Sequence, residues 1–277
     1  MDQTHRVIQY QQYQSGRWTM AAVKTPAEAP VSLTVNGERW LSFSCTPTDL
    51  EALAVGFLFN EGHIADAADI ATVRACDSGA NVDVWLRRAI SRPDSWQRTS
   101  GCAGGATSDD FTPEIDLLRL QSDTCLAAPM VGELMAALYR AQEMYAQTGG
   151  VHCSALSDGE RIVMLAEDIG RHNTLDKLAG RCLLEREVMA GSILLTTGRI
   201  SSEMALKAAR MEVPILISRS APTSLAVERA DRWGLTLIGY ARRDRFNVYT
   251  HPWRLNEQPN RDRVEDLMYA ALSPAAL

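Results

Sequence analysis

The sequence predicts an α/β fold, with a three-layer α/β sandwich in the second half of the chain and a smaller α+β unit before it. After Val151, short apolar strands alternate with helical segments, which is the pattern of βαβ units. Earlier in the chain, Asn36-Gly37 stands between two alternating apolar segments and predicts a tight hairpin turn. A loop-rich stretch at about 91–122, with prolines and a cluster of glycines, separates the two patterns.

These patterns divide the 277 residues into three parts, and that length suffices for two modest domains. Residues 1–28 are expected to form a flexible, poorly ordered arm. Residues 29–112 are expected to form the small α+β domain, with Cys102 in a loop near its end. Residues 113–277 are then the α/β domain.

Local signals place the individual elements. Thr48-Asp49-Leu50-Glu51 has the pattern of a capping box and predicts a helix that ends near Gly62. Further strands are expected at 71–75, 82–86, 151–156, 161–166, 191–197, 214–218 and 235–240, and further helices at 131–147, from about Asn173, at 201–210 and at 223–233 before Gly234.

Composition excludes several classes of protein. The formal net charge of −6 argues against broad nucleic-acid binding, which needs a basic face. The polar first 20 residues do not resemble a secretory signal, and no run of 18 apolar residues predicts a membrane span. The protein is therefore expected in the cytoplasm, where thiols stay reduced. No two of the six cysteines have CxxC spacing, which argues against a structural zinc site: Cys45, Cys76, Cys102, Cys125, Cys153 and Cys182.

Cys102 is the first candidate for chemistry. It stands in Ser100-Gly101-Cys102-Ala103-Gly104-Gly105, where small neighbours leave the sulfur accessible. Glycines also allow backbone N–H groups to turn inward and stabilise a thiolate, which would lower the pKa of the thiol. The alternative is an ordinary surface cysteine in a loop, and these residues alone leave both interpretations open.

A second candidate is the segment 167–177, which runs from a strand end through a glycine into a helix. Ligands of α/β sheets bind at such strand ends. Arg171 could bind a phosphate with two hydrogen bonds, and His172 could transfer a proton near neutral pH. Asn173 or Thr174 could cap the helix. The alternative is a charged helix entrance with weak salt bridges.

The segment 198–204 repeats this design, with Arg199 where an anion would lie and Ser201 or Ser202 as the helix cap. Plain capping is the alternative. His152 begins a strand, where a lone histidine is more often structural than catalytic.

A basic and aromatic stretch near the C-terminus could hold a nucleotide. Its arginines could clamp a pyrophosphate while its aromatic ring stacks on a base, and the alternative is a solvated run of charge. The stretch consists of Tyr240, Ala241, Arg242, Arg243, Asp244 and Arg245.

Taken in order, these segments resemble the FdhD family, the accessory sulfurtransferases of formate dehydrogenase. The resemblance covers roughly residues 30–252. It is carried by Gly101-Cys102, Thr148-Gly149-Gly150-Val151-His152, the segment 167–173, the segment 198–204 and Asn247-Val248-Tyr249-Thr250.

The resemblance implies a function. Family members take sulfur from a cysteine desulfurase and pass it to the molybdenum cofactor, Mo-bis(molybdopterin guanine dinucleotide), which formate dehydrogenase needs. Cys102 matches the cysteine that carries the sulfur as a persulfide, and Tyr240–Arg245 matches the stretch that binds the guanine dinucleotide end. The family also implies a cytidine deaminase-like C-terminal domain, a homodimer and no metal ligated by the protein itself.

The sequence departs from the family pattern at Gly105, where many members carry a second cysteine. A local disulfide with Cys102 is therefore impossible, although a single thiolate suffices to accept and release sulfur.

Two other functions compete with sulfur transfer. One is a chaperone that carries the molybdenum cofactor without a covalent step. The other is a zinc deaminase, but His152 is followed by Cys153-Ser154, so the H-x-E motif is missing, and the chain has no P-C-x-x-C motif.

Overall fold

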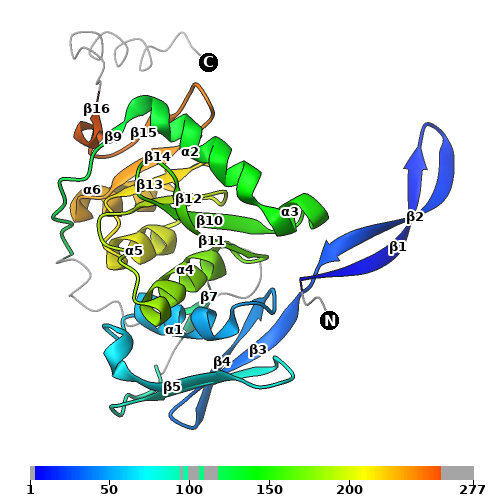
Figure 1. Cartoon of the computed structure of the whole chain (residues 1–277), viewed down its shortest axis with the longest axis horizontal. Helices are drawn as coiled ribbons and strands as arrows, with labels where there is room; N and C mark the ends of the chain where they lie inside the picture. Colours follow the sequence, from blue (N-terminus) through cyan, green and yellow to red (C-terminus); the bar gives the residue numbers. More distant parts are fainter. Residues whose placement is uncertain (1–3, 94–95, 99–105, 109–117, 257–277) are drawn as a thin grey trace.

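The computed structural model describes residues 4–93, 96–98, 106–108 and 118–256 (Figure 1). The largest of its sheets lies in the second half of the chain and has the strand order β11-β10-β12-β13-β14-β15. Strands β12, β13 and β14 are parallel to each other, and the other strands run antiparallel to their neighbours. The strands are β10 (His152–Ser157), β11 (Ile162–Asp168), β12 (Ile193–Thr196), β13 (Ile215–Ser218), β14 (Thr236–Gly239) and β15 (Asn247–Val248).

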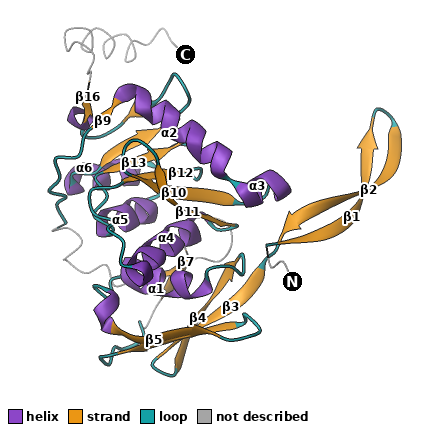
Figure 2. Ribbon diagram, viewed as in Figure 1, coloured by secondary structure: helices purple, strands orange, loops and turns teal. Residues whose placement is uncertain are grey.

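Helices cover both faces of this sheet, as the alternation of strands and helices predicts (Figure 2). Helix α2 (Ala128–Ala141) shares a hydrophobic core with one face. Helices α4 (Arg171–Glu185), α5 (Ser202–Arg210) and α6 (Ser224–Trp233) pack in the core on the other face. All residues of β12, β13 and β14 are buried, as expected for parallel strands covered on both sides. The cytidine deaminase-like arrangement stays a prediction.

The helix expected at 131–147 is interrupted. Gln142 has extended backbone dihedrals and separates α2 from the short helix α3 (Glu143–Thr148). A small parallel pair, β9 (Leu126–Ala127) with β16 (Leu255–Asn256), lies next to the start of α2. None of the helices in the described ranges is long and apolar enough to cross a membrane.

The small α+β unit contains a four-stranded sheet and one helix. The Asn36-Gly37 turn has positive φ at both residues, 50° and 84°, which confirms the predicted hairpin. The sheet order is β4-β3-β6-β5, and its apolar face shares a core with the helix. The elements are β3 (Ala29–Val35), β4 (Glu38–Cys45), α1 (Leu50–Asn60), a 3-10 turn (Ala67–Asp69), β5 (Ile70–Ala75) and β6 (Asn81–Leu86).

The predicted capping box at the start of α1 is wrong. Asp49 is the N-cap residue, it has left-handed dihedrals, and its side chain makes no capping hydrogen bond. The Glu51 carboxylate accepts a hydrogen bond from the Ala75 N–H instead, at 2.9 Å. The Thr48 hydroxyl accepts one from Nζ of Lys177 on α4, at 3.2 Å. Both side chains therefore serve tertiary contacts.

Two glycines allow the small unit to pack tightly on the α/β domain. A Cβ on Gly56 of α1 would lie 1.7 Å from the main-chain oxygen of Asp176, and one on Gly180 of α4 would lie 1.8 Å from that of Ala52. The two helix backbones are thus in direct contact, which side chains at these positions would prevent. The two units are joined by packed helices and not only by a linker.

The expectation of a poorly ordered N-terminal arm is wrong. Strands β1 (His5–Gln14) and β2 (Arg17–Pro26) form a continuous antiparallel hairpin that projects from the body (Figure 1). Its turn residues, Ser15 and Gly16, both have positive φ. The Ser-Gly pair is a turn signal that the sequence contains.

Candidate functional site

Most segments selected from the sequence meet at one edge of the large sheet. The parallel strands β12, β13 and β14 all end there, and the antiparallel strand β10 begins there. Strand β11 ends there as well, because Asp168 pairs with His152. Ligands of open α/β sheets bind at this end of the strands. We call it the carboxyl edge, and it consists of His152, residues 168–172, residues 197–201, residues 218–220 and residues 240–245.

A fully buried ion pair anchors the carboxyl edge. Nζ of Lys177 lies 2.7 Å from Oδ2 of Asp168, and neither side chain is exposed. The ammonium also donates to the main-chain oxygen of Thr46 at 3.2 Å, the hydroxyl of Thr48 at 3.2 Å and the main-chain oxygen of Glu167 at 3.3 Å. The buried cation therefore has both a counter-charge and oxygen acceptors, which buried charges require.

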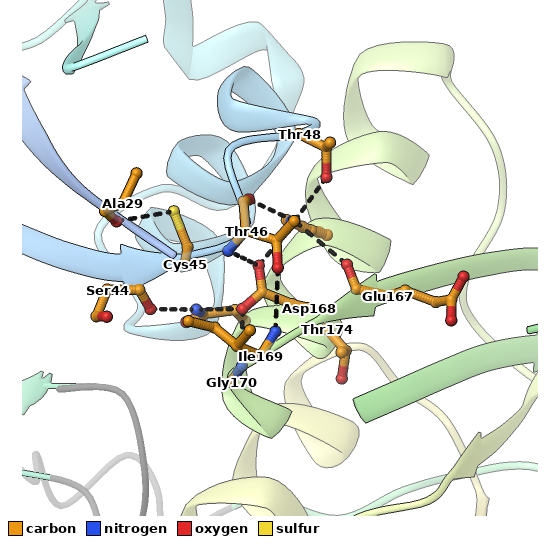
Figure 3. Close-up of polar contacts among 12 residues, drawn as sticks. Ala29, Ser44, Cys45, Thr46, Thr48, Glu167, Asp168, Ile169, Gly170 and Thr174 are labelled. Atoms are coloured by element: carbon orange, nitrogen blue, oxygen red, sulfur yellow. Dashed lines mark hydrogen bonds and ion pairs between the residues drawn. The ribbon is translucent and has the colours of Figure 1, made fainter. Parts of the chain in front are cut away.

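The Asp168 carboxylate organises the chain around it (Figure 3). Its Oδ1 accepts hydrogen bonds from the N–H of Gly170 and the side-chain amide of Asn173, both at 2.8 Å. Its Oδ2 accepts one from the N–H of Thr46 at 3.1 Å. The Asn173 amide also donates to the main-chain oxygen of Ser44 at 3.0 Å. One carboxylate thus links the end of β11, the start of α4 and the loop after β4.

The expected caps of α4 differ from the observed ones. Gly170 is the N-cap residue, and the Thr174 hydroxyl donates to the main-chain oxygen of Arg171 at 2.7 Å. The expectation that Asn173 or Thr174 caps this helix is therefore wrong. Ser201 does occupy the N-cap position of α5, but its side chain makes no capping hydrogen bond.

His172 is buried beneath the edge, with Nε2 3.3 Å from the Ser201 hydroxyl. Burial lowers the pKa of His172 well below its usual value, and the charges of Lys207 and Arg171 lower it further. The imidazole is consequently neutral at pH 7. Proton transfer near neutral pH, which the sequence suggested for this residue, does not fit this environment.

A cavity of about 480 Å³ opens beside His152 at the carboxyl edge. Burial lowers the pKa of His152, and the nearby charges of Arg171 and Arg199 add to this effect. The walls include a neutral imidazole, two phenol rings and small or polar residues, a set that suits a planar ligand. Residues that line the cavity include Tyr139, Gln142, Tyr145, Gly150, His152 and Thr197.

Cations border this cavity. Arg199 is exposed, and its charge reaches His152. The guanidinium of Arg219 lies over the ring of Tyr139, with its carbon 4.8 Å from the ring centroid. The combination of aromatic walls and a basic rim is suited to a ligand that is both flat and anionic.

The stretch 240–245 forms a fixed turn on the same edge. The Arg242 guanidinium donates to the main-chain oxygens of Arg219 at 2.6 Å and Ala241 at 3.0 Å. The Arg242 N–H donates to the oxygen of Arg245 at 2.7 Å. A Cβ on Gly132 of α2 would lie 2.1 Å from the main-chain oxygen of Arg243, so the helix backbone also supports the turn.

The side chains of this turn differ in exposure. Ala241 is buried and Arg242 is half-buried, so both belong to the frame of the turn. Exposed side chains are Tyr240, Arg243, Asp244 and Arg245. The turn presents two of its three arginines to solvent, and binding of a dinucleotide there stays a prediction.

Cys102 lies outside the described residues. The short strands β7 (Trp96–Arg98) and β8 (Ala106–Ser108) pair antiparallel on either side of it. The predicted domain limit between residues 112 and 113 also falls outside the described ranges.

The other cysteines differ in their capacity to assist Cys102. Burial raises the pKa of Cys45 to about 12 and of Cys182 to about 11, and it also raises the pKa of Cys153. These three side chains are held as thiols. Cys76 is half-buried, and hydrogen bonds from Ser78 and the chain nearby lower the pKa of its thiol, while Cys125 is exposed. Among the described cysteines, a second reactive thiol would therefore be Cys76 or Cys125.

Sequence reasoning missed several residues of this edge. Arg219 follows a buried strand in the same way that Arg199 follows its own, so the strand-then-arginine pattern could have found it. Tyr139 and Tyr145 gave no such signal, because only the packing of α2 and α3 brings them to the strand ends.

The fold and this edge define a class of protein, the α/β proteins that bind ligands at the carboxyl ends of parallel strands. The model of the FdhD/NarQ family matches residues 26–256. The chain belongs to the FdhD/NarQ family.

Individual relatives cover nearly all of the chain. It is 36% identical over 256 residues to the sulfur carrier protein FdhD of Bacillus pumilus, covering 89% of this chain and 95% of that relative. It is 35% identical over 255 residues to the sulfur carrier protein FdhD of Bacillus subtilis, covering 88% and 95%. The crystal structure of a formate dehydrogenase accessory protein from Desulfotalea psychrophila is similar, with a TM-score of 0.76 and 28% identity, covering 91% of this chain and 100% of that one.

We predict that Asp168→Asn destabilises the protein by about 3–5 kcal/mol, because it leaves the buried Lys177 ammonium without its counter-charge. Urea unfolding followed by circular dichroism measures the change. The double variant Asp168→Asn/Lys177→Met should be more stable than Asp168→Asn alone. Asp77→Asn, which alters an exposed ion pair with Arg74, should change stability by less than about 0.5 kcal/mol.

The low pKa of His172 predicts a pH-dependent stability. Below about pH 6.5 the unfolded chain binds a proton at this histidine before the folded chain does. The free energy of unfolding should therefore fall with decreasing pH, by up to about 1.4 kcal/mol per pH unit. In urea titrations between pH 5 and pH 7.5, His172→Gln should flatten this slope. A slope unchanged in His172→Gln would contradict the prediction.

Proposed function

We propose that the protein is a sulfur carrier for the maturation of formate dehydrogenase. It accepts sulfur from a cysteine desulfurase as a persulfide on Cys102 and passes it to Mo-bis(molybdopterin guanine dinucleotide), its substrate. The observation that carries the proposal is the family match over residues 26–256, whose relatives include sulfur carrier proteins, together with a cysteine in a glycine-rich stretch of the sequence.

The covalent step needs one thiolate. The Cys102 thiolate attacks the terminal sulfur of the donor's persulfide, the S–S bond of the donor breaks, and the donor's thiolate leaves. In the second transfer the new S–S bond breaks and its electron pair stays on Cys102. The sulfur atom then takes two electrons from the molybdenum centre and becomes sulfide. No local disulfide is required, which agrees with Gly105 in this chain.

The carboxyl edge is the proposed site for the cofactor. The exposed side chains of Arg243 and Arg245 bind its phosphates, and Tyr240 stacks on the guanine. Support for this role comes from the fixed backbone of the turn and from the further cations Arg199 and Arg219 along the edge. We also propose the cytidine deaminase-like arrangement of this domain, a cytoplasmic location and a homodimer as the working unit.

A non-covalent cofactor chaperone is the second candidate, because the arginines of the carboxyl edge support cofactor binding equally well without sulfur transfer. The two candidate functions differ only in whether Cys102 carries the sulfur covalently.

Cys102→Ala is expected to abolish formate dehydrogenase maturation in a strain without its own copy of the gene, while guanine nucleotide binding persists. Mass spectrometry after incubation with a cysteine desulfurase and cysteine should show one added sulfur on the Cys102 peptide of the wild type. Cys182→Ala, which removes a buried thiol that has no proposed role in transfer, is the control and should gain the sulfur normally. Full maturation by Cys102→Ala would instead support the chaperone.

Arg243→Ala/Arg245→Ala is expected to weaken GDP binding at least tenfold, because each lost charged hydrogen bond costs about 1.5–3 kcal/mol. Adding Arg242→Ala should weaken it further and also loosen the turn. Calorimetry measures the affinity. Arg232→Ala, an exposed arginine on α6, is the control, and equal affinities in all four proteins would reject the phosphate-binding role.

A further inference from the structure

A break between two helices places a buried glutamine at the cavity beside His152. Gln142 has extended backbone dihedrals and belongs to neither α2 nor α3. The Glu167 carboxylate of β11 fixes this break, because it accepts hydrogen bonds from the N–H groups of Met144 and Tyr145, both at 2.8 Å. The N–H groups at a helix start have no partner within the helix and require such an acceptor. The interruption is therefore a supported part of the fold.

The Gln142 side chain leaves one polar atom without a partner. Gln142 is only 3% exposed, and it lines the cavity. Its amide nitrogen donates to the main-chain oxygen of Leu138 at 3.4 Å, so Oε1 is the other end of the amide. Within the described ranges, no donor makes a hydrogen bond to Oε1. Buried acceptors without a donor are rare because they cost stability, so this oxygen points to a ligand that donates to it.

His152 supplies a donor to the same cavity. The Thr197 hydroxyl accepts a hydrogen bond from the Cys153 N–H at 3.1 Å, and its own proton is left for Nδ1 of His152, 3.4 Å away. The imidazole is neutral, because burial and the charges of Arg171 and Arg199 lower its pKa. A neutral imidazole that accepts at Nδ1 carries its proton on Nε2. No acceptor in the described part of the chain binds Nε2, so this N–H is available to a ligand.

The walls and the volume of the cavity restrict the shape of its ligand. The rings of Tyr139 and Tyr145 are part of the wall, and they favour a flat molecule. A volume of about 480 Å³ lies in the lower part of the range for ligand pockets, roughly 300–1,000 Å³. The cavity therefore suits one fused ring system and not a whole dinucleotide. That ring system must carry a donor for Gln142 and an acceptor for His152.

We propose that this cavity is a subsite for the 2-amino-4-oxopyrimidine ring, which pterin and guanine share. The ring carries a carbonyl oxygen, a ring N–H and an amino group along one edge. The carbonyl oxygen accepts from Nε2 of His152, and the amino group donates to Oε1 of Gln142. Gln142 thereby selects rings that carry the amino group. This rests on the proposed function, whose cofactor contains both rings and whose guanine is held at the turn 240–245, so the pterin is the expected occupant.

Calorimetry with free ring compounds tests the subsite. The wild type should bind pterin-6-carboxylate roughly tenfold more tightly than lumazine-6-carboxylate, which has a second carbonyl in place of the amino group. Gln142→Leu should weaken binding of pterin-6-carboxylate roughly tenfold and remove this preference, because it deletes the acceptor. Gln121→Leu, which changes an exposed glutamine outside the cavity, is the matched control and should bind both compounds as the wild type does.

GDP and IDP distinguish the two sources of the ring, because IDP lacks only the amino group of GDP. With pterin as the occupant, Gln142→Leu weakens pterin-6-carboxylate and leaves GDP unchanged. With guanine as the occupant, Gln142→Leu instead removes a preference for GDP over IDP. Either result supports the subsite. Unchanged affinities for both pterin-6-carboxylate and GDP in Gln142→Leu overturn it.

Tyr145→Ala decides the matter if Gln142→Leu fails to fold by circular dichroism. The Tyr145 side chain is 43% exposed, and the contact with Glu167 is made by its main chain, so the ring can be removed without loss of that contact. Loss of stacking should weaken the ring compound roughly tenfold, and an unchanged affinity overturns the subsite. Sulfur loading on Cys102 is measured separately by mass spectrometry. Failure of the sulfur-carrier function would therefore leave these affinities unchanged, and failure of the subsite would leave the loading intact.

Discussion

The buried ion pair between Asp168 and Lys177 is the constraint on which the rest of the structure depends. Two charges without solvent are tolerated only when every oxygen and proton finds a partner, and a missing partner costs several kcal/mol. Here the partners come from the end of β11, from α4 and from the loop after β4 that carries Thr46 and Thr48. These three segments therefore have one acceptable arrangement. Since His152 pairs with Asp168, that arrangement also fixes the cavity wall.

A second buried charge cluster extends the same constraint along the helices. Asp176 of α4 lies 2.6 Å from Nζ of Lys207 on α5 and accepts a hydrogen bond from Asn60 of α1 at 2.8 Å. Burial raises the pKa of Asp176, and the ammonium opposes this shift. The glycine contacts between α1 and α4 bring these groups within reach. Charge neutralisation and backbone packing thus both orient the small unit on the α/β domain.

Much of the fold could be predicted because its signals are local. The Asn36-Gly37 turn and the apolar strands at 193–196 and 215–218 need only neighbouring residues to define them. The predictions were wrong where tertiary contacts, and not the local sequence, determine the hydrogen-bond partner of a side chain. Thr48 and Glu51 fit the pattern of a capping box but bind partners on α4 and β5. The Asn173 amide donates to the Asp168 carboxylate and does not cap the helix. The same polar groups can satisfy either role, and sequence spacing does not choose between them.

The candidate site could be predicted only in part, because the sequence indicates where strands end but not how helices pack. Segments that follow parallel strands meet at one edge, so Arg199 and the stretch 240–245 were found, whereas Tyr139 depended on helix packing. The chemistry of the edge was harder to foresee. Both His152 and His172 have lowered pKa values, so the edge offers fixed cations and neutral rings, not a proton donor and acceptor poised at pH 7. Such an edge is suited to hold an anionic ligand still while a group elsewhere reacts, as the proposed transfer of sulfur to a bound cofactor requires.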